Sequence, residues 1–258
     1  MDYPQADEGI AAQLSSAPRI LLCTDYDGTL SPLVDRPQDA LLPPVLRQQL
    51  ECLSHSPGCV VAILSGRTLA DIRSRVGLEG IVYGGNHGLE MEGAGWTFVQ
   101  PQAAECRADL ASVLERLRPH LENLPGVLME DKGLTASVHY RLAPCDCHAQ
   151  IASIVVETVQ DYAALVIRSG KMVHEIRPRL QWHKGHAIEW LQQRFNVESS
   201  NVIYLGDDVT DEDAFALLSS SITVKVGEGV PTRAKYCLAN TDAVADFLNW
   251  LVQLRQSG

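Results

Sequence analysis

Three short apolar runs, each followed at once by small or polar residues, constrain the fold of this chain more than any other feature. The runs lie at residues 19–24, 59–64 and 81–83, and apolar residues at helical spacing lie between them at 43–53 and 69–76. The shortness of the runs and the turn residues that follow them favour buried strands over helices. Strands that alternate with helices in this way predict a parallel sheet covered by helices on both faces. In such sheets ligands bind at the carboxyl ends of the strands.

The middle of the chain follows a different pattern. An amphipathic helix is expected at 100–124 and a second helix at 146–163, each followed or preceded by hairpin-like strand pairs at 127–141 and 165–176. This pattern predicts an α+β unit with an antiparallel sheet. After it the first pattern resumes, with helices and strands expected at 183–195, 202–205, 212–218, 222–226 and 243–254.

The expected organisation is therefore an α/β protein whose core is interrupted by a second unit. The core would consist of residues 1–92 and 177–258, and the inserted smaller α+β domain would span residues 93–176. We interpret the first dozen residues as a frayed start.

The charge balance argues against some classes of partner. Lys and Arg together number 21 against 32 Asp and Glu, which gives a net charge of −11. Binding along a nucleic acid backbone or an anionic membrane requires clustered Lys and Arg, so we expect no nucleic acid and no membrane as partners. A small anionic substrate remains compatible where local cations or a metal reverse the field.

The seven cysteines indicate a reducing compartment. Their number is odd and their spacing is not that of a secreted disulfide framework, so we expect reduced thiols and a cytoplasmic protein. The first 18 residues carry acids and no apolar stretch of a signal peptide. No apolar run approaches the roughly 18 residues of a spanning helix. The sequence does not indicate the oligomeric state.

Two acidic residues follow the first predicted strand. Asp25 and Asp27 are one residue apart, so their side chains point to the same side of the chain and repel each other. The simplest alternative is an ordinary Asp-Gly turn at Asp27-Gly28. A divalent cation would offset the repulsion, since carboxylate and carbonyl oxygens suit Mg²⁺.

A second acidic segment follows the strand expected at 202–205. Five acidic residues occupy the seven positions from Asp207 to Asp213. Asp211 could serve only as a helix cap, but Asp207 and Asp208 have no structural need to be acidic. This segment therefore predicts metal binding.

Two further segments could hold an anion. Ser65-Gly66 lies between a strand and a helix, where a hydroxyl group and free backbone N–H groups form an anion site, although the same pair is also a routine junction. Lys184 lies at a predicted helix start, where the helix dipole disfavours a cation. A phosphate ligand would relieve that conflict.

These four segments, in this order, resemble the four motifs of the haloacid dehalogenase superfamily of phosphohydrolases. Further segments are similar to the trehalose-6-phosphate phosphatase family, and the resemblance covers about residues 19–250. They are residues 84–90 (Gly-Gly-Asn-His-Gly-Leu-Glu), 130–132 (Glu-Asp-Lys), 138–141 (Val-His-Tyr-Arg), 175–178 (Glu-Ile-Arg-Pro) and 206–215 (Gly-Asp-Asp-Val-Thr-Asp-Glu-Asp-Ala-Phe).

The resemblance implies a Rossmann-like core with a mobile inserted cap, a requirement for Mg²⁺ and an aspartyl-phosphate intermediate. It implies that Asp25 is the nucleophile and that Asp27 is first the general acid and then the general base. Mg²⁺ would be held by Asp25, the backbone carbonyl of Asp27 and Asp207, with Asp208 and Asp211 in the layer around these ligands.

The resemblance also implies how the substrate is held. The transferring phosphoryl group would be bound by Asp25, Thr29, Ser65, Gly66 and Lys184. The sugar would be bound by Asn86, His87, Glu130, Lys132, Arg141 and Glu175. The implied substrate is the small sugar phosphate trehalose 6-phosphate.

Three alternatives remain open. A phosphatase of another sugar phosphate, of the glucosyl- or mannosyl-phosphoglycerate type, would share the four motifs. A phosphosugar mutase would return the phosphate to sugar instead of releasing it. A non-catalytic phosphosugar sensor would bind without turnover, which the acids at Asp25, Asp27 and Asp207 argue against.

Overall fold

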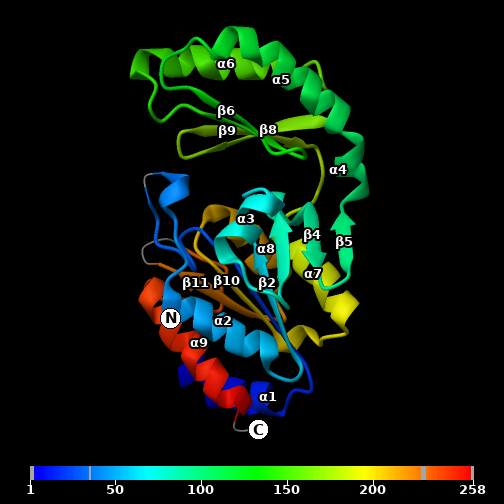
Figure 1. Cartoon of the computed structure of the whole chain (residues 1–258), viewed down its shortest axis with the longest axis vertical. Coiled ribbons are helices and arrows are strands. Elements are labelled where there is room, and N and C mark those ends of the chain that lie inside the picture. The colour runs from blue at the N-terminus through cyan, green and yellow to red at the C-terminus, as the bar shows by residue number, and fades with distance from the viewer. Residues whose placement is uncertain (1–2, 35, 228–230, 257–258) are drawn as a thin grey trace. The chain divides into compact units, whose positions relative to one another are not determined.

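The protein consists of two compact units, shown in Figure 1 by a computed structural model that describes residues 3–34, 36–227 and 231–256. Both ends of the chain, Met1–Phe98 and Trp182–Gly258, form the first unit, which we call the core unit. The middle segment Val99–Gln181 forms the second, which we call the inserted unit.

A single sheet organises the core unit. Its strand order in the described residues is β12-β11-β10-β1-β2-β3-β4-β5. The strands from β12 to β3 pair in parallel, whereas β4 runs antiparallel to β3. The predicted parallel-sheet core is thus confirmed. The bounds are β1 Ile20–Thr24, β2 Cys59–Leu64, β3 Val82–Gly85, β4 Glu90–Gly93, β5 Trp96–Val99, β10 Val202–Gly206, β11 Ile222–Val226 and β12 Tyr236–Leu238.

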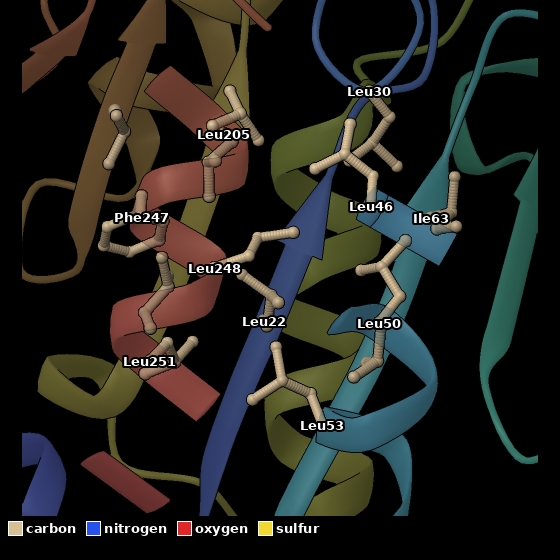
Figure 2. Packing of buried hydrophobic residues seen from close by; sticks show 14 of the residues in the cluster. Leu22, Leu30, Leu46, Leu50, Leu53, Ile63, Leu205, Phe247, Leu248 and Leu251 are labelled. Atoms are coloured by element: carbon tan, nitrogen blue, oxygen red, sulfur yellow. The ribbon is translucent and has the colours of Figure 1, made fainter. Parts of the chain in front are cut away.

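Helices cover both faces of this sheet because alternate residues of each strand point to opposite faces. In β1, Ile20 and Leu22 join one apolar cluster, and Leu21 and Cys23 join the other. Figure 2 shows the first cluster, where leucines of β1 and α2 pack with Phe247 and its neighbours on α9. Its helices are α1 Glu8–Ser16, α2 Pro44–His55, α3 Leu69–Val76 and α9 Thr241–Gln256, and the second cluster contains α7 Lys184–Phe195 and α8 Val209–Leu217.

The beginning of the chain differs from the sequence interpretation. Helix α1 is ordered because the Asp7 carboxylate accepts hydrogen bonds from the backbone N–H groups of Gly9 and Ile10. Ile10 and Leu14 are then buried in the first apolar cluster. The frayed start that we expected is therefore wrong for residues 8–12, since a cap and two core residues hold this segment, and residues 1–2 lie outside the described part of the chain.

The inserted unit packs two long helices on one face of an antiparallel sheet with the order β6-β7-β9-β8. The helix expected at 100–124 is two helices that meet at Cys106. The opposite face of the sheet carries charged side chains, described below. The bounds are α4 Pro101–Glu105, α5 Arg107–Leu121, β6 Leu128–Asp131, β7 Ala136–His139, α6 His148–Val159, β8 Leu165–Gly170 and β9 Val173–Pro178.

Across residues 3–34, 36–227 and 231–256, no helix combines the length and the apolar character that crossing a membrane requires.

The packing predicts where the core unit is sensitive to mutation. Leu50 is fully buried between α2 and the sheet, so Leu50→Ala should lower the free energy of unfolding by about 2–5 kcal/mol. Leu41→Ala removes the same atoms at a position that is 73% exposed and should change it by less than about 0.5 kcal/mol. Urea unfolding followed by tryptophan fluorescence measures both. Equal losses would contradict this view of the core.

Candidate active site

The register of the parallel strands brings three of the predicted segments to one edge of the sheet. Thr24 of β1 pairs with Leu205 of β10 on one side and with Ile63 of β2 on the other. The residues that follow these strands include Asp25, Ser65 and Asp207. The Asp25 backbone N–H donates to the Leu205 carbonyl at 2.8 Å, which fixes the start of the first loop against β10.

A buried lysine lies between two of the acids. The Lys184 Nζ is 2.9 Å from Asp25 Oδ1 and 2.8 Å from Asp211 Oδ1. All three residues are buried. Burial works against the charge of Lys184, but the carboxylates of Asp211 and Asp25 raise its pKa above the ordinary value. The lysine is therefore held as a cation beside Asp25.

Asp211 uses its carboxylate to organise the loop that contains it. Its Oδ1 accepts hydrogen bonds from Lys184 and from the Tyr204 hydroxyl at 2.6 Å, and its Oδ2 accepts from the backbone N–H groups of Asp207 and Asp208 at 3.0 and 3.1 Å. Burial would raise the pKa of Asp211, but Lys184 and these hydrogen bonds hold it below the ordinary value. With two hydrogen bonds on each oxygen, Asp211 holds Lys184 and the loop that contains Asp207 in place.

Asp207 is the acid that faces Asp25. The Thr29 hydroxyl donates to Asp207 Oδ1 at 3.3 Å, and Lys225 Nζ donates to the Asp207 backbone carbonyl. Gly28 adopts a φ of 84°, and a Cβ there would come within 2.0 Å of Asp207 Oδ2. Only glycine gives the two loops this close approach.

The acids fit a divalent cation. Asp25, Asp207 and Asp211 each offer an oxygen, and these oxygens lie within 4.8 Å of one another. Burial, followed by the charge of Asp211, raises the pKa of Asp207 to about 6. Burial also raises the pKa of Asp25 well above its ordinary value, against the opposing charge of Lys184. Lys184 supplies one positive charge against three carboxylates, and carboxylate oxygens are the ligands that Mg²⁺ prefers. Because Asp211 is already saturated, Asp25 and Asp207 are the two side chains available to a cation.

Asp27 is held by an arginine from the second motif. Arg67 donates from Nε to Asp27 Oδ2 at 2.7 Å and from Nη2 to Asp27 Oδ1 at 2.6 Å. The sequence analysis did not assign a role to Arg67. Its position directly after Ser65-Gly66 at the end of β2 was the available signal.

The Ser-Gly-Arg and Asn-His-Gly loops are bound to each other. The backbone N–H groups of Asn86 and His87 donate to the carbonyls of Arg67 and Ser65 at 2.7 and 2.8 Å. Asn86 and His87 have φ values of 49° and 58°, which are uncommon for residues other than glycine and occur often at functional sites.

The side chains of these two loops lie at different depths. The Asn86 side chain is buried and donates to Glu90 Oε1 at 2.8 Å, whereas His87 is half-buried and lies against Gly66. The Ser65 hydroxyl is buried and accepts from the Arg67 backbone N–H at 3.2 Å.

The inserted unit gathers charged residues on one face of its sheet. Glu130, Ser137 and Glu175 are direct cross-strand neighbours in β6, β7 and β9, so their side chains share a face. Lys132 Nζ lies 3.8 Å from a carboxylate oxygen of Glu130 and 4.0 Å from one of Glu175. The same face contains His139, 3.1 Å from Glu130, and Arg177, which pairs with Glu175. We call this set of residues the polar face. It consists of Glu130, Lys132, Ser137, His139, Glu175 and Arg177.

One residue assigned to the sugar lies apart from these contacts. Arg141 is exposed in the segment after β7, and its Nη2 donates to the Lys171 carbonyl at 3.3 Å. Asp208 is also exposed, and its side chain caps helix α8 by accepting from the Val209 backbone N–H at 2.6 Å.

Two residues beside the site, Tyr204 and Lys225, were given no functional role from the sequence. Tyr204 was interpreted only as a strand residue, although its hydroxyl binds Asp211. Lys225 is a buried lysine within the apolar strand β11. A lysine at such a position was the available signal, because lysine is rarely buried without a partner.

The fold indicates the class of protein to which this chain is similar. A solved haloacid dehalogenase-like hydrolase from Bacteroides thetaiotaomicron matches 90% of this chain and 98% of its own with a TM-score of 0.66, at 14% identity. That identity supports a common fold alone. The chain therefore has the fold of haloacid dehalogenase-like hydrolases, as the sequence resemblance implied.

The family follows from closer relatives. Residues 23–242 match the sequence model of the trehalose-phosphatase family. The trehalose-phosphate phosphatase of Mycobacterium tuberculosis (strain ATCC 25618 / H37Rv) is 37% identical over 250 residues, which covers 90% of this chain and 61% of that protein. A crystal structure described as a trehalose-6-phosphate phosphatase related protein matches 92% of this chain and 99% of its own, with a TM-score of 0.81 and 26% identity.

This chain belongs to the trehalose-phosphatase family. It spans less than two thirds of the length of the mycobacterial relative.

The saturated carboxylate of Asp211 yields a stability prediction. Asp211→Asn places an amide NH₂ group against hydrogen-bond donors and removes an ion pair with Lys184. The free energy of unfolding should therefore fall by at least about 2 kcal/mol. Asp208→Asn is the matched control, because asparagine caps a helix as well as aspartate does. Urea unfolding in EDTA, followed by the fluorescence of the tryptophans, which all lie in the core unit, measures both. A loss in Asp208→Asn as large as in Asp211→Asn would count against this role.

Proposed function

We propose that this chain hydrolyses trehalose 6-phosphate to trehalose and phosphate with the help of Mg²⁺ and through an aspartyl-phosphate on Asp25. The observation that carries the proposal is the pairing of Asp25 with the buried Lys184, 2.9 Å apart, beside the acid Asp207. The similarity to the mycobacterial trehalose-phosphate phosphatase supports the choice of substrate.

In the first half of the reaction, an oxygen of Asp25 attacks phosphorus and the bond from phosphorus to the sugar oxygen breaks. Asp27 gives its proton to that sugar oxygen, which is a poor leaving group when unprotonated. Lys184 stabilises negative charge on the phosphoryl oxygens. In the second half, Asp27 takes a proton from water as the water attacks the phosphorus, which releases phosphate and restores Asp25.

The metal ligands in this proposal are the side chains of Asp25 and Asp207 and the backbone carbonyl of Asp27. Mg²⁺ bound there supplies positive charge that offsets the repulsion between the Asp25 carboxylate and the phosphate dianion. Asp211 and Asp208 hold the loop of Asp207, Asp211 by its buried hydrogen bonds and Asp208 by capping α8.

The phosphoryl group would be bound by Lys184, by the hydroxyls of Thr29 and Ser65 and by the Gly66 region at the end of β2. Thr29 is buried and already donates to Asp207, which supports a place beside the metal. In the Asn-His-Gly loop, we propose that Asn86 fixes the loop through Glu90 and that His87 presents its side chain to the substrate.

We further propose that the inserted unit is the substrate-recognition domain and that its polar face binds the sugar. Phosphate chemistry is shared by all monoesters, so the choice of sugar requires groups that bind hydroxyls. The two carboxylates of Glu130 and Glu175 can each accept hydrogen bonds from sugar hydroxyls, and Lys132 lies within 4.0 Å of both. The exposed Arg141 would contribute from the segment after β7. The odd number of cysteines supports the cytoplasm as the compartment.

The nucleophile gives the first test. Asp25→Asn should abolish phosphate release, because an amide is a very poor nucleophile toward phosphorus. Free phosphate is measured over about ten sugar phosphates, including the phosphoglycerate type, and the substrate with the highest kcat/KM is identified. A higher kcat/KM for another sugar phosphate would mean that trehalose 6-phosphate is not the preferred substrate. Binding of a sugar phosphate without turnover by the unaltered chain would favour a non-catalytic sensor.

The metal gives the second test. Mg²⁺ should raise the Tm, because a ligand that binds only the folded state stabilises it by about 2.7 kcal/mol at 100 times its Kd. Asp207→Asn removes a carboxylate ligand, so this rise should shrink. Exposed Asp213→Asn serves as the control. A rise that is unchanged in Asp207→Asn would remove Asp207 from the metal ligands.

The polar face gives the third test. Glu130→Ala and Glu175→Ala should each lower kcat/KM for trehalose 6-phosphate by about 10–200-fold, because sugar hydroxyls lose a partner in a desolvated site. Hydrolysis of p-nitrophenyl phosphate, which has no sugar, should change little. Glu115→Ala, on the exposed side of α5, is the matched control. A parallel fall on both substrates would mean that these carboxylates support the fold instead.

A further inference from the structure

We propose that Arg67 is a positioning residue that holds the Asp27 carboxylate in the orientation needed for proton transfer, and that Asp71 and Arg75 hold Arg67 in turn. The inference rests on the proposed function, since it assigns to Asp27 the transfer of a proton to the leaving group. It concerns residues of the core unit alone.

The contact between Arg67 and Asp27 is two-pronged. Nε and Nη2 donate to different oxygens of the carboxylate, at 2.7 and 2.6 Å. Two parallel hydrogen bonds from a planar guanidinium fix the plane and the direction of a carboxylate, which a single point charge does not. The side chain of Asp27 is 38% exposed, so without the arginine it would turn freely toward solvent.

Arg67 is itself fixed from a second side. Its Nη1 donates to Asp71 Oδ2 at 2.8 Å, and its guanidinium lies 5.6 Å from the centre of the Tyr26 ring. Burial opposes the charge of Asp71, but hydrogen bonds from Arg75 and Arg67 lower its pKa, so this carboxylate stays ionised.

The chain of charges ends on the backbone of a loop. Arg75 Nε lies 2.9 Å from Asp71 Oδ2, and Arg75 Nη1 donates to the carbonyls of Gln38 and Ala40 at 3.2 and 3.1 Å. Negatively and positively charged side chains thus alternate from Asp27 through helix α3, and the last of them binds the backbone of residues 38–40. An arrangement held at both ends in this way fixes the arginine fork before any substrate arrives.

The acid requires such support because of its surroundings. Asp27 follows Asp25 by two residues and precedes Gly28, whose backbone is the most permissive of all residues. The nearby acids Asp25 and Asp207 would repel a loose carboxylate. A carboxylate offers about four acceptor positions, and the fork occupies two, so positions remain for the proton that the reaction moves. A misplacement of about 1 Å can cost about 10²-fold in rate.

The test compares Arg67→Ala and Arg67→Lys on trehalose 6-phosphate and on p-nitrophenyl phosphate, whose leaving group needs little protonation. Both variants should lower kcat on trehalose 6-phosphate by about 10–100-fold, with KM within about threefold. Both should keep the first-turnover release of p-nitrophenol within about threefold, because that step precedes hydrolysis of the aspartyl-phosphate, in which Asp27 acts on water for both esters. Lysine keeps the charge but not the fork, so Arg67→Lys should behave like Arg67→Ala. Arg73→Ala, which changes an exposed arginine of helix α3, should leave both rates unchanged.

A double variant separates positioning from general support of the fold. If Arg67 acts through Asp27, then adding Arg67→Ala to Asp27→Asn should cost less than about threefold beyond Asp27→Asn alone. Asp71→Asn should reproduce part of the Arg67→Lys effect, about 3–10-fold, because the fork then loses one of its supports. Should Arg67→Ala fail to fold, Arg67→Lys with an intact first-turnover release of p-nitrophenol carries the test.

Three results would overturn the inference. Wild-type rates in Arg67→Lys would reduce the role of Arg67 to its charge. Equal losses in the first turnover of the two esters would place it in phosphate binding or in the fold, and multiplicative losses in the double variant would separate it from Asp27. If the unaltered chain prefers another sugar phosphate, the proposed substrate is wrong, and the same comparison on that sugar phosphate decides the role of Arg67.

Discussion

The buried contact of Lys184 with Asp25 and Asp211 is the interaction on which the rest of the site depends. A lysine and two aspartates removed from water are costly unless each is paired and hydrogen-bonded. Asp211 meets this condition with four hydrogen bonds, two of them from the backbone of its own loop. The start of α7, which carries Lys184, and the loop after β10 are therefore fixed by the same carboxylate.

The negative charge of the carboxylates at this edge of the sheet is only partly compensated. Lys184 pairs with both Asp25 and Asp211, yet Asp25 and Asp207 still have raised pKa values. Burial is the largest cause of both shifts, so keeping these two carboxylates in the fold costs stability, in the way that active sites commonly give up stability for function. The stability of the core comes instead from apolar packing on both faces of the sheet, which Figure 2 shows for one face.

Features with a local cause could be predicted from the sequence. The buried strands β1, β2 and β10 were predicted from unbroken apolar runs, and the end of α3 from Gly77, which adopts a φ of 57°. The short strands β4, β5 and β12 were not predicted, because β4 and β5 mix polar and apolar residues and β12 is only three residues long. These strands form by pairing with adjacent strands of the sheet, which their own residues do not indicate.

The candidate site divides in the same way. The acids could be singled out because charged residues directly after apolar strands have no structural explanation, and Lys184 because a cation is disfavoured at a helix start. The partners Arg67, Tyr204 and Lys225 could not, because their roles come from contacts across 40, 7 and 18 residues of sequence that only the fold creates. The burial of Asn86 also required the structure, since its left-handed backbone turns the side chain toward Glu90.

The strand order has a consequence for how the protein is made. Strand β1, which carries Asp25, lies between β2 and β10, and β10 is synthesised more than 170 residues after β1. The inserted unit has an apolar cluster of its own and contacts that are mostly local, so it can fold while the first half of the core waits on the ribosome. Until β10 arrives, β1 has an open edge and Asp25 has neither Lys184 nor Asp207 beside it. A nascent chain is therefore exposed at β1 to pairing with other strands, and the acidic cluster forms only when the last third of the chain has emerged.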